Sequence, residues 1–163
     1  MPEHKTAHSF DSISDKRSRI LILGTMPSVQ SRKVGFYYSH PQNRFWLVLA
    51  ECLDQPIPET IENKTLLLLN NSIALWDVLA SCEISGSDDS SIRSPVYNDI
   101  EALASSNPIE KILCNGKKAY NLYCNGFSLS LPVMCMPSTS PANAAWSMER
   151  LVEAWRTELN YHE

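Results

Sequence analysis

The chain has 163 residues, of which 44% are hydrophobic, and a formal net charge of −4. This length suits one domain whose core needs no disulfide or metal, and the acidic balance excludes a general attraction to nucleic acid. Any DNA contact must therefore depend on local clusters of Lys and Arg. Residues 1–19 lack an apolar signal core, and no apolar run approaches the roughly 20 residues of a membrane-spanning helix. We therefore expect a cytoplasmic protein that does not enter a membrane.

The cysteines are odd in number, widely spaced and without a Cys-x-x-Cys or Cys/His cluster, so they predict neither a zinc nor an iron–sulfur site. We expect reduced and mostly buried thiols, and no metal or organic cofactor. The five are Cys52, Cys82, Cys114, Cys124 and Cys135.

The first third of the chain predicts a tail, a strand, a loop and a helix. Residues 1–18 are interpreted as a polar N-terminal tail. The apolar run 19–24 ends in Gly and predicts a buried parallel strand. A polar loop through Gly35 and an aromatic-rich stretch, 36–41, follow. Apolar residues at helical spacing then predict a helix over 43–53, with Pro41 near its first turn.

The middle of the chain leaves one register open. Residues 59–69 predict a second helix, with Asn70 and Asn71 as a plausible end. Residues 72–78 predict a second buried strand, but an alternative register places that strand at 66–69, and periodicity does not decide between them.

The remaining elements are expected in the order loop 85–94, helix 98–105, strand 111–115, helix 116–124, strand 133–136, loop 137–141 and helix 144–159. Strands that alternate with helices predict an α/β domain over 19–163, with a parallel sheet covered on both faces. Ligands bind beyond the carboxyl ends of the strands in such folds. The segments after the strands, 25–28, 77 onward, 115–118 and 138–143, should therefore meet at one site.

Two kinds of segment carry candidate chemistry. The loops at 24–28 and 137–143 hold Pro between small or polar residues and suit phosphate or sugar binding, although ordinary loop chemistry is the more common explanation of such a pattern. Tyr37, Tyr38 and His40 crowd together before Asn43. These residues suit stacking on a planar ring and holding a water, or else an aromatic core cluster with a helix cap.

Five motifs of this chain resemble the uracil-DNA glycosylase superfamily, specifically its mismatch-specific members, over about residues 19–159. In order they are Gly24-Thr-Met-Pro-Ser28, His40-Pro-Gln-Asn-Arg-Phe-Trp46, Asn115-Gly-Lys-Lys-Ala-Tyr120, Met136-Pro-Ser-Thr-Ser-Pro-Ala-Asn143 and Leu151-Val-Glu-Ala-Trp-Arg156. The resemblance implies a three-layer α/β/α fold around a four-stranded parallel sheet. It also implies action on a base flipped out of the DNA duplex.

The first motif departs from the mismatch-specific pattern, because Met26 stands where those relatives carry a catalytic Asn. Together with the strand motif at 73–78, this makes the chain similar to the hypoxanthine-DNA glycosylase branch, where the Asn of the second motif serves catalysis. Asn43 is therefore the principal catalytic candidate, and we expect its amide oxygen to hold the attacking water. The alternative role for Asn43 is that of a polar residue at a helix N-terminus.

The same resemblance implies residues that contact the base. Tyr38 matches the aromatic residue that stacks on the flipped base, and Thr25 and Met26 line the base site. Asp77 is expected to accept the N1–H of hypoxanthine and to repel the N1 lone pair of adenine, unless it merely caps a turn. Asn70 and Asn71 are the alternatives to Asp77 for reading the base.

The DNA contacts are expected from the last loop and from nearby cations. Ser138, Ser140 and Asn143 lie where family members grip phosphates. Ala142 is small where wedge-bearing relatives carry a bulky apolar residue. Lys117 and its neighbour Lys118 begin a helix and suit a phosphate. Further candidates for a basic rim are Arg32, Lys33, Arg44 and Arg93.

The sequence thus predicts a monomeric, monofunctional DNA glycosylase that removes a deaminated base, hypoxanthine first, in base excision repair. The alternatives are a uracil or G·U/G·T mismatch glycosylase and a non-catalytic protein that binds DNA lesions. A nucleosidase acting on free metabolites is disfavoured, because the chain has no Gly-rich phosphate loop.

Overall fold

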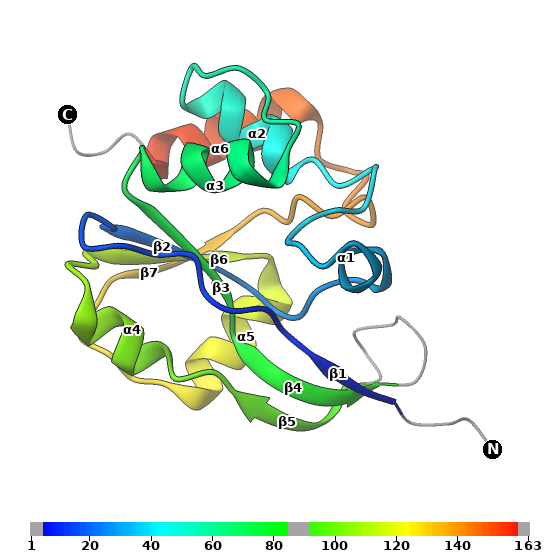
Figure 1. The fold of residues 1–163 in the computed structure, drawn as a ribbon, viewed down its shortest axis with the longest axis vertical. Coiled ribbons are helices and arrows are strands. Elements are labelled where there is room, and N and C mark those ends of the chain that lie inside the picture. The colour runs from blue at the N-terminus through cyan, green and yellow to red at the C-terminus, as the bar shows by residue number, and fades with distance from the viewer. Residues whose placement is uncertain (1–4, 85–91, 160–163) are drawn as a thin grey trace.

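A four-stranded parallel sheet forms the centre of the protein, in a computed structural model that describes residues 5–84 and 92–159. Its order is β3-β2-β6-β7 (Figure 1). The strands are β2 (Ile20–Gly24), β3 (Ile73–Asp77), β6 (Lys111–Asn115) and β7 (Val133–Met136). The predicted parallel sheet is confirmed. The alternative strand at 66–69 is wrong, because those residues form the last turn of a helix.

Helices cover both faces of this sheet, which confirms the three layers (Figure 1). One face carries α2 (Phe45–Cys52), α3 (Ile61–Leu69) and α6 (Met148–Leu159), and the other carries α4 (Ile100–Ser106) and α5 (Lys117–Gly126). In β2, Ile20 and Ile22 pack in the first core, whereas Leu21 and Leu23 pack in the second. A strand buried on both faces needs an almost continuous apolar run, which is why the sequence predicts this strand clearly.

Trp155 of α6 fixes the loop that follows β7. Its side chain is fully buried, and its indole Nε1 donates a hydrogen bond to the carbonyl oxygen of Pro137 at 3.0 Å. Its ring also meets Phe45 of α2 edge-on, with centroids 6.4 Å apart. The last helix therefore determines where the polar loop after β7 lies.

A second, antiparallel sheet was not expected. Its order is β1 (Lys5–His8), β4 (Leu79–Ile84) and β5 (Arg93–Tyr97). Residues 5–8 are thus a strand rather than part of a tail, and Ile13 forms an isolated bridge to Leu75 of the central sheet. The strands β1 and β5 are short and have few apolar residues, so they give little periodicity and tertiary pairing alone reveals them. Within the loop expected at 85–94, residues 85–91 lie outside the described residues, and 93–94 begin β5.

A short helix, α1 (Val29–Val34), replaces part of the polar loop expected through residue 35. The Ser28 hydroxyl accepts the Ser31 N–H at 3.1 Å at its start. Gly35 ends it with φ 86°, in the left-handed region that glycine tolerates best. The other helix boundaries lie within a few residues of those expected, the largest difference being that α6 begins at Met148 instead of near residue 144.

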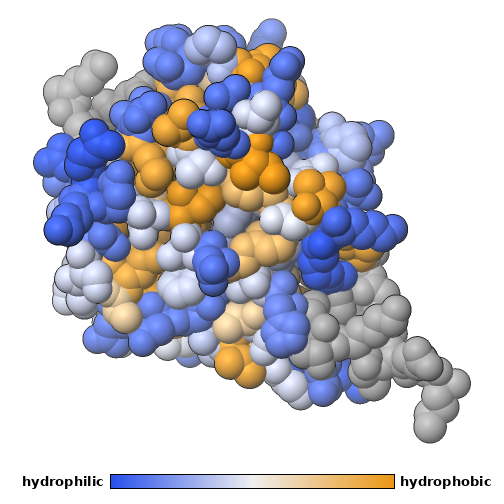
Figure 2. All heavy atoms as spheres, viewed as in Figure 1, coloured by the Kyte–Doolittle hydropathy of each residue, from blue (hydrophilic) through white to orange (hydrophobic). Residues whose placement is uncertain are grey.

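The surface and the cysteines are those of an ordinary globular protein. Apolar side chains reach the viewed face in patches separated by hydrophilic ones (Figure 2). None of the five cysteines forms a disulfide, with Cys52, Cys82 and Cys114 buried and Cys124 and Cys135 exposed. Burial raises the pKa of the Cys114 thiol to about 12, so this thiol stays protonated. None of the helices in 5–84 and 92–159 is both long and apolar enough to span a membrane.

Replacing Trp155 with Phe tests the anchoring of the last loop. We expect Trp155→Phe to lower the free energy of unfolding by about 1–3 kcal/mol, because the Pro137 carbonyl loses its donor and a cavity forms. Urea unfolding followed by circular dichroism measures the change. Trp146→Phe is the matched control, since this half-buried indole donates to no described atom, and it should cost less than about 1 kcal/mol. Equal losses in both variants would contradict the anchoring role.

Candidate active site

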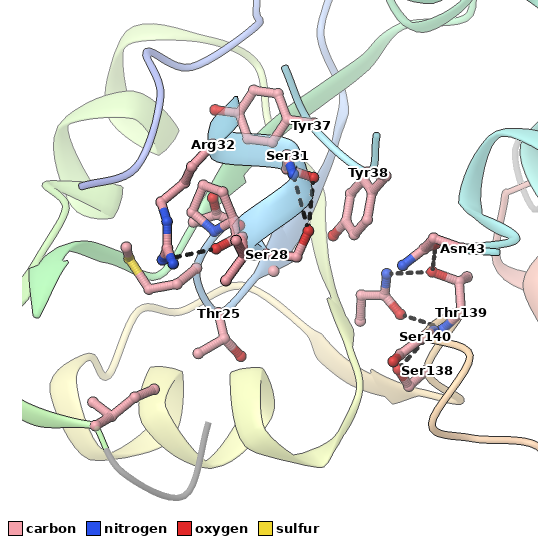
Figure 3. Close-up of a pocket in the computed structure, with 17 residues that line it drawn as sticks. Thr25, Ser28, Ser31, Arg32, Tyr37, Tyr38, Asn43, Ser138, Thr139 and Ser140 are labelled. Atoms are coloured by element: carbon pink, nitrogen blue, oxygen red, sulfur yellow. Dashed lines mark hydrogen bonds between the residues drawn. The ribbon is translucent and has the colours of Figure 1, made fainter. Parts of the chain in front are cut away.

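The carboxyl ends of the central strands surround a cavity of about 220 Å³ (Figure 3). The last residues of β3 and β6 and the segments that follow β2 and β7 all contribute to its wall, so the expected convergence is confirmed. The lining residues are Gly24, Thr25, Met26, Pro27, Ser28, Val29, Ser31, Arg32, Tyr37, Tyr38, Asn43, Asp77, Ile92, Asn115, Ser138, Thr139 and Ser140.

Most of the expected site residues line this one cavity, as the list above shows: Asn43, Tyr38, Asp77, Thr25, Met26, Ser138 and Ser140. Lys117 and Asn143 do not. They line an adjoining hollow of about 670 Å³, to which Ser138 and Ser140 also contribute. Asn70 and Asn71 lie at the end of α3, before β3 begins, and are therefore remote from the carboxyl edge of the sheet. Of the three candidates for reading the base, Asp77 is the one that lines the cavity, at the end of β3.

Asn43 is held by its side-chain oxygen. Its Oδ1 accepts the Phe45 N–H at 2.9 Å, at the start of α2, and the Thr139 hydroxyl proton, also at 2.9 Å. An amide oxygen has two lone pairs, so these donors occupy both. The structure therefore contradicts the expectation that this oxygen is open to a water. The Nδ2 of Asn43 donates to no atom in the described part of the chain and remains available at the cavity.

Two residues that sequence reasoning missed complete this arrangement. Thr139 is fully buried, and its N–H donates to Asn115 Oδ1 at 3.0 Å. Asn115 Nδ2 in turn donates to Thr139 Oγ1 at 3.0 Å. The position of Asn115 at the carboxyl end of a buried strand was the available signal. Nothing in the loop sequence distinguished Thr139 from its neighbours Ser138 and Ser140.

Tyr38 forms an aromatic wall of the cavity. Its ring stacks on Phe45 with centroids 4.0 Å apart and 19° between the planes. Its φ of 51° lies in the left-handed region, a strained conformation for a bulky residue that is found mostly at functional sites. Burial raises the pKa of its phenol, the negative charge of Asp77 raises it further, and the Asn115 amide partly opposes this. The Tyr38 hydroxyl is therefore protonated at neutral pH.

Gly24 allows Tyr38 and Asp77 to meet at the floor of the site. Asp77 is 3% exposed and ends β3 beside Gly24, its register partner in β2. A Cβ atom on Gly24 would lie 2.6 Å from Asp77 Oδ1 and 2.7 Å from the Tyr38 hydroxyl oxygen. Both distances are shorter than van der Waals contact, so any side chain here displaces one of the two groups.

Hydrogen bonds within the loop at 137–143 fix its conformation. Ser138 Oγ accepts the Ser140 N–H at 3.1 Å, and Asn143 Nδ2 donates to the Ser138 carbonyl oxygen at 3.0 Å. Arg44 donates to the carbonyl oxygens of Trp146 and Asn143, at 2.6 and 3.2 Å. Arg44 was expected on a DNA-binding rim. The structure corrects this, because its guanidinium fixes the loop instead.

Few cationic side chains lie at the cavity in the described part of the chain. Arg32 is the single cation among the described lining residues, and its Nη1 donates to the Pro27 carbonyl oxygen at 3.3 Å. Lys33, Arg93 and Lys117 are exposed. Across 5–84 and 92–159, no three His, Cys, Asp or Glu side chains group closely enough to hold a metal ion.

Comparison with known proteins assigns the family. A model described as the uracil DNA glycosylase superfamily matches residues 10–159, which is most of the chain. The chain belongs to this superfamily. Its active site is therefore that of a DNA glycosylase, an enzyme that cuts the bond between a base and its sugar.

Individual relatives support the same assignment for this glycosylase. It is 34% identical over 145 residues to a protein named hypoxanthine DNA glycosylase from Methanosarcina acetivorans, covering 86% of this chain and 90% of that one. A protein of the same name from Methanosarcina barkeri is 32% identical over 112 residues, covering 68% and 71%. A solution NMR structure, described as a candidate uracil DNA glycosylase from Methanosarcina acetivorans, superposes with a TM-score of 0.83. It is 31% identical and covers 96% of this chain and 98% of its own.

Gly24→Ala tests the crowded floor of the glycosylase site. We expect base release to fall roughly 10- to 100-fold, because the added methyl displaces Asp77 or Tyr38 from the cavity. Release of the base from a labelled oligonucleotide measures the effect. Gly35→Ala is the control: its Cβ meets nothing within 4 Å, although its φ of 86° makes it costly to stability. Activity retained by Gly24→Ala and lost by Gly35→Ala would contradict this account.

Proposed function

We propose that this DNA glycosylase removes hypoxanthine from DNA, with Asn43 as its catalytic residue. The observation that carries the proposal is the placement of Asn43, Tyr38 and Asp77 around one cavity at the carboxyl edge of the sheet. The names of the two Methanosarcina relatives support hypoxanthine as the base.

The reaction replaces a carbon–nitrogen bond with a carbon–oxygen bond. The bond between C1′ of deoxyribose and N9 of hypoxanthine breaks, and its electron pair leaves with the base. Water supplies the oxygen that bonds to C1′, and its proton is taken up by the departing base. Positive charge grows on the sugar and negative charge on the base in the transition state. The enzyme accelerates the reaction by orienting groups toward those charges.

Recognition of the base is assigned to Tyr38 and Asp77. The Tyr38 ring lines the cavity with Phe45 stacked behind it, so it offers a rigid surface for a flipped purine. The Asp77 carboxylate at the floor accepts hydrogen bonds. Hypoxanthine presents N1–H to such an acceptor, whereas adenine presents an N1 lone pair that the carboxylate repels. Thr25 and Met26 complete the wall on the β2 side.

The adjoining hollow is assigned to the DNA strand. Ser138 and Ser140 line both the cavity and the hollow, so a strand lying in the hollow can deliver its flipped nucleotide to the cavity. Lys117 offers an exposed cation there, and Asn143 keeps the loop in shape. Phosphate contacts of this kind position the DNA without reading its sequence.

Base release from oligonucleotides that each carry one hypoxanthine, uracil, xanthine or mismatched thymine tests the substrate. We expect hypoxanthine to be released fastest. Asn43→Ala should reduce that release roughly 10²- to 10³-fold while DNA binding persists, because a group acting mainly in the transition state is lost. Faster release of uracil would keep the enzyme class and overturn the substrate. Binding without any release would favour a protein that only recognises lesions.

Asp77→Ala tests how the base is selected. In an Asn43→Ala background, in which base release is slow, we expect wild-type Asp77 to favour hypoxanthine-containing over adenine-containing DNA. Asp77→Ala should reduce that preference roughly 10-fold, since the carboxylate no longer accepts N1–H or repels N1. Fluorescence anisotropy with the two matched oligonucleotides measures both affinities. An unchanged ratio would remove Asp77 from base selection.

A further inference from the structure

We infer that Asn43 acts as a hydrogen-bond donor to the departing base, and that Thr139 and Asn115 are positioning residues that hold its amide in this orientation. The inference rests on the proposed function, since it names the role of a residue in that reaction. It follows from the direction of each hydrogen bond in a chain that begins and ends on the backbone.

The first link fixes Asn115. A backbone N–H can only donate, and the N–H of Thr139 points at Asn115 at 3.0 Å. The Asn115 atom that receives it must therefore be Oδ1. The amide group of Asn115 then faces the Thr139 hydroxyl as a donor, with 3.0 Å between Nδ2 and Oγ1.

The second link fixes Asn43. Because the Thr139 oxygen accepts from Asn115, its own proton is directed to Asn43, 2.9 Å away. The Phe45 N–H meets the same Asn43 oxygen at 2.9 Å. Turning the Asn43 amide over would place its NH₂ group against two donors and break both bonds. Thr139 is fully buried, so no water is available to replace them.

The capping role of Asn43 does not account for this chain. One acceptor is enough to satisfy the Phe45 N–H at the start of α2. The contacts with Thr139 and Asn115 add nothing to that cap, yet they come from the last residue of β6 and the loop after β7, which both line the cavity (Figure 3). Their effect is to determine which end of the Asn43 amide meets a substrate.

The end that remains is Nδ2, a donor. A donor aimed at the leaving base stabilises the negative charge that arrives there when the glycosidic bond breaks, and such contacts contribute roughly 10²- to 10³-fold to rate. An amide oxygen would instead have held the attacking water. The two roles predict opposite results when the amide is replaced by a carboxylate.

Asn43→Asp is the deciding variant, compared with Asn43→Ala. Aspartate keeps an acceptor for the Phe45 N–H and the Thr139 hydroxyl, so its melting temperature should stay near that of the wild type, but it has no donor. We expect single-turnover hypoxanthine release, at saturating enzyme, to fall roughly 10²-fold or more in Asn43→Asp, as in Asn43→Ala. Wild-type rates in Asn43→Asp, or rates at least 10-fold above those of Asn43→Ala, would overturn the donor role.

The positioning residues are tested by removing one hydroxyl. Thr139→Val keeps the side-chain shape, and we expect it to slow the single-turnover rate roughly 10-fold with little change in the Kd for DNA. Thr139→Ser should restore most of the rate. Neither change should slow Asn43→Ala further. Thr157→Val is the control, because that hydroxyl donates to the Glu153 carbonyl oxygen on α6, outside the lining of the cavity.

The outcomes separate the inference from the proposed function. A Thr139→Val loss that persists in the Asn43→Ala background, or no loss at all, overturns the positioning role even when the wild type releases hypoxanthine. Release of uracil in place of hypoxanthine overturns the proposed substrate, and the same variants then test the donor role on uracil. Wild-type protein that releases no base overturns both.

Discussion

The hydrogen bonds of Thr139 join three segments that the sequence keeps far apart. Its hydroxyl reaches Asn43, 96 residues earlier, and its main chain and side chain both meet Asn115, 24 residues earlier. Thr139 itself is fully buried, so its bonds are costly to leave unmade. Behind it, Trp155 of α6 holds the carbonyl of Pro137. The shape of the active site therefore depends on how the last helix packs against the sheet, rather than on the preferences of the loops.

An acidic protein that works on DNA must concentrate its positive charge. Here part of that charge is used internally, since Arg44 donates to two carbonyl oxygens of the last loop. Arg32 lines the cavity and Lys117 lines the adjoining hollow, the side that is proposed to face DNA. Few phosphate contacts mean weak binding to undamaged DNA, because nonspecific affinity grows with each neutralised phosphate. Under the proposed function, selectivity then depends on what the cavity gains from a flipped base, so the roles proposed for Tyr38 and Asp77 carry a larger share of the discrimination.

The sequence was most informative where burial leaves a clear hydrophobic pattern. The strand at 20–24 is apolar throughout because helices cover both of its faces, and it was read to within one residue. The strand β5 was missed because its residues are largely exposed and include Pro95, a residue typical of edges and loops. Motif order placed Asn43 at the site, but hydrogen-bond direction is a three-dimensional property. Only the position of Thr139 beside Asn115 shows that the Asn43 oxygen is already engaged.

If the Asn43 amide donates to the departing base, as proposed, the enzyme accelerates hydrolysis mainly by stabilising the leaving group. Met26, at the position where mismatch-specific relatives carry a catalytic Asn, offers the cavity an apolar side chain, and the Asn43 oxygen has no free lone pair. Neither residue can therefore accept a proton from water. This arrangement suits a transition state in which the bond to the base is largely broken before water arrives, because a sugar cation needs little activation of its nucleophile. Catalytic energy is then best directed to the departing base, which is the role proposed here for Nδ2 of Asn43.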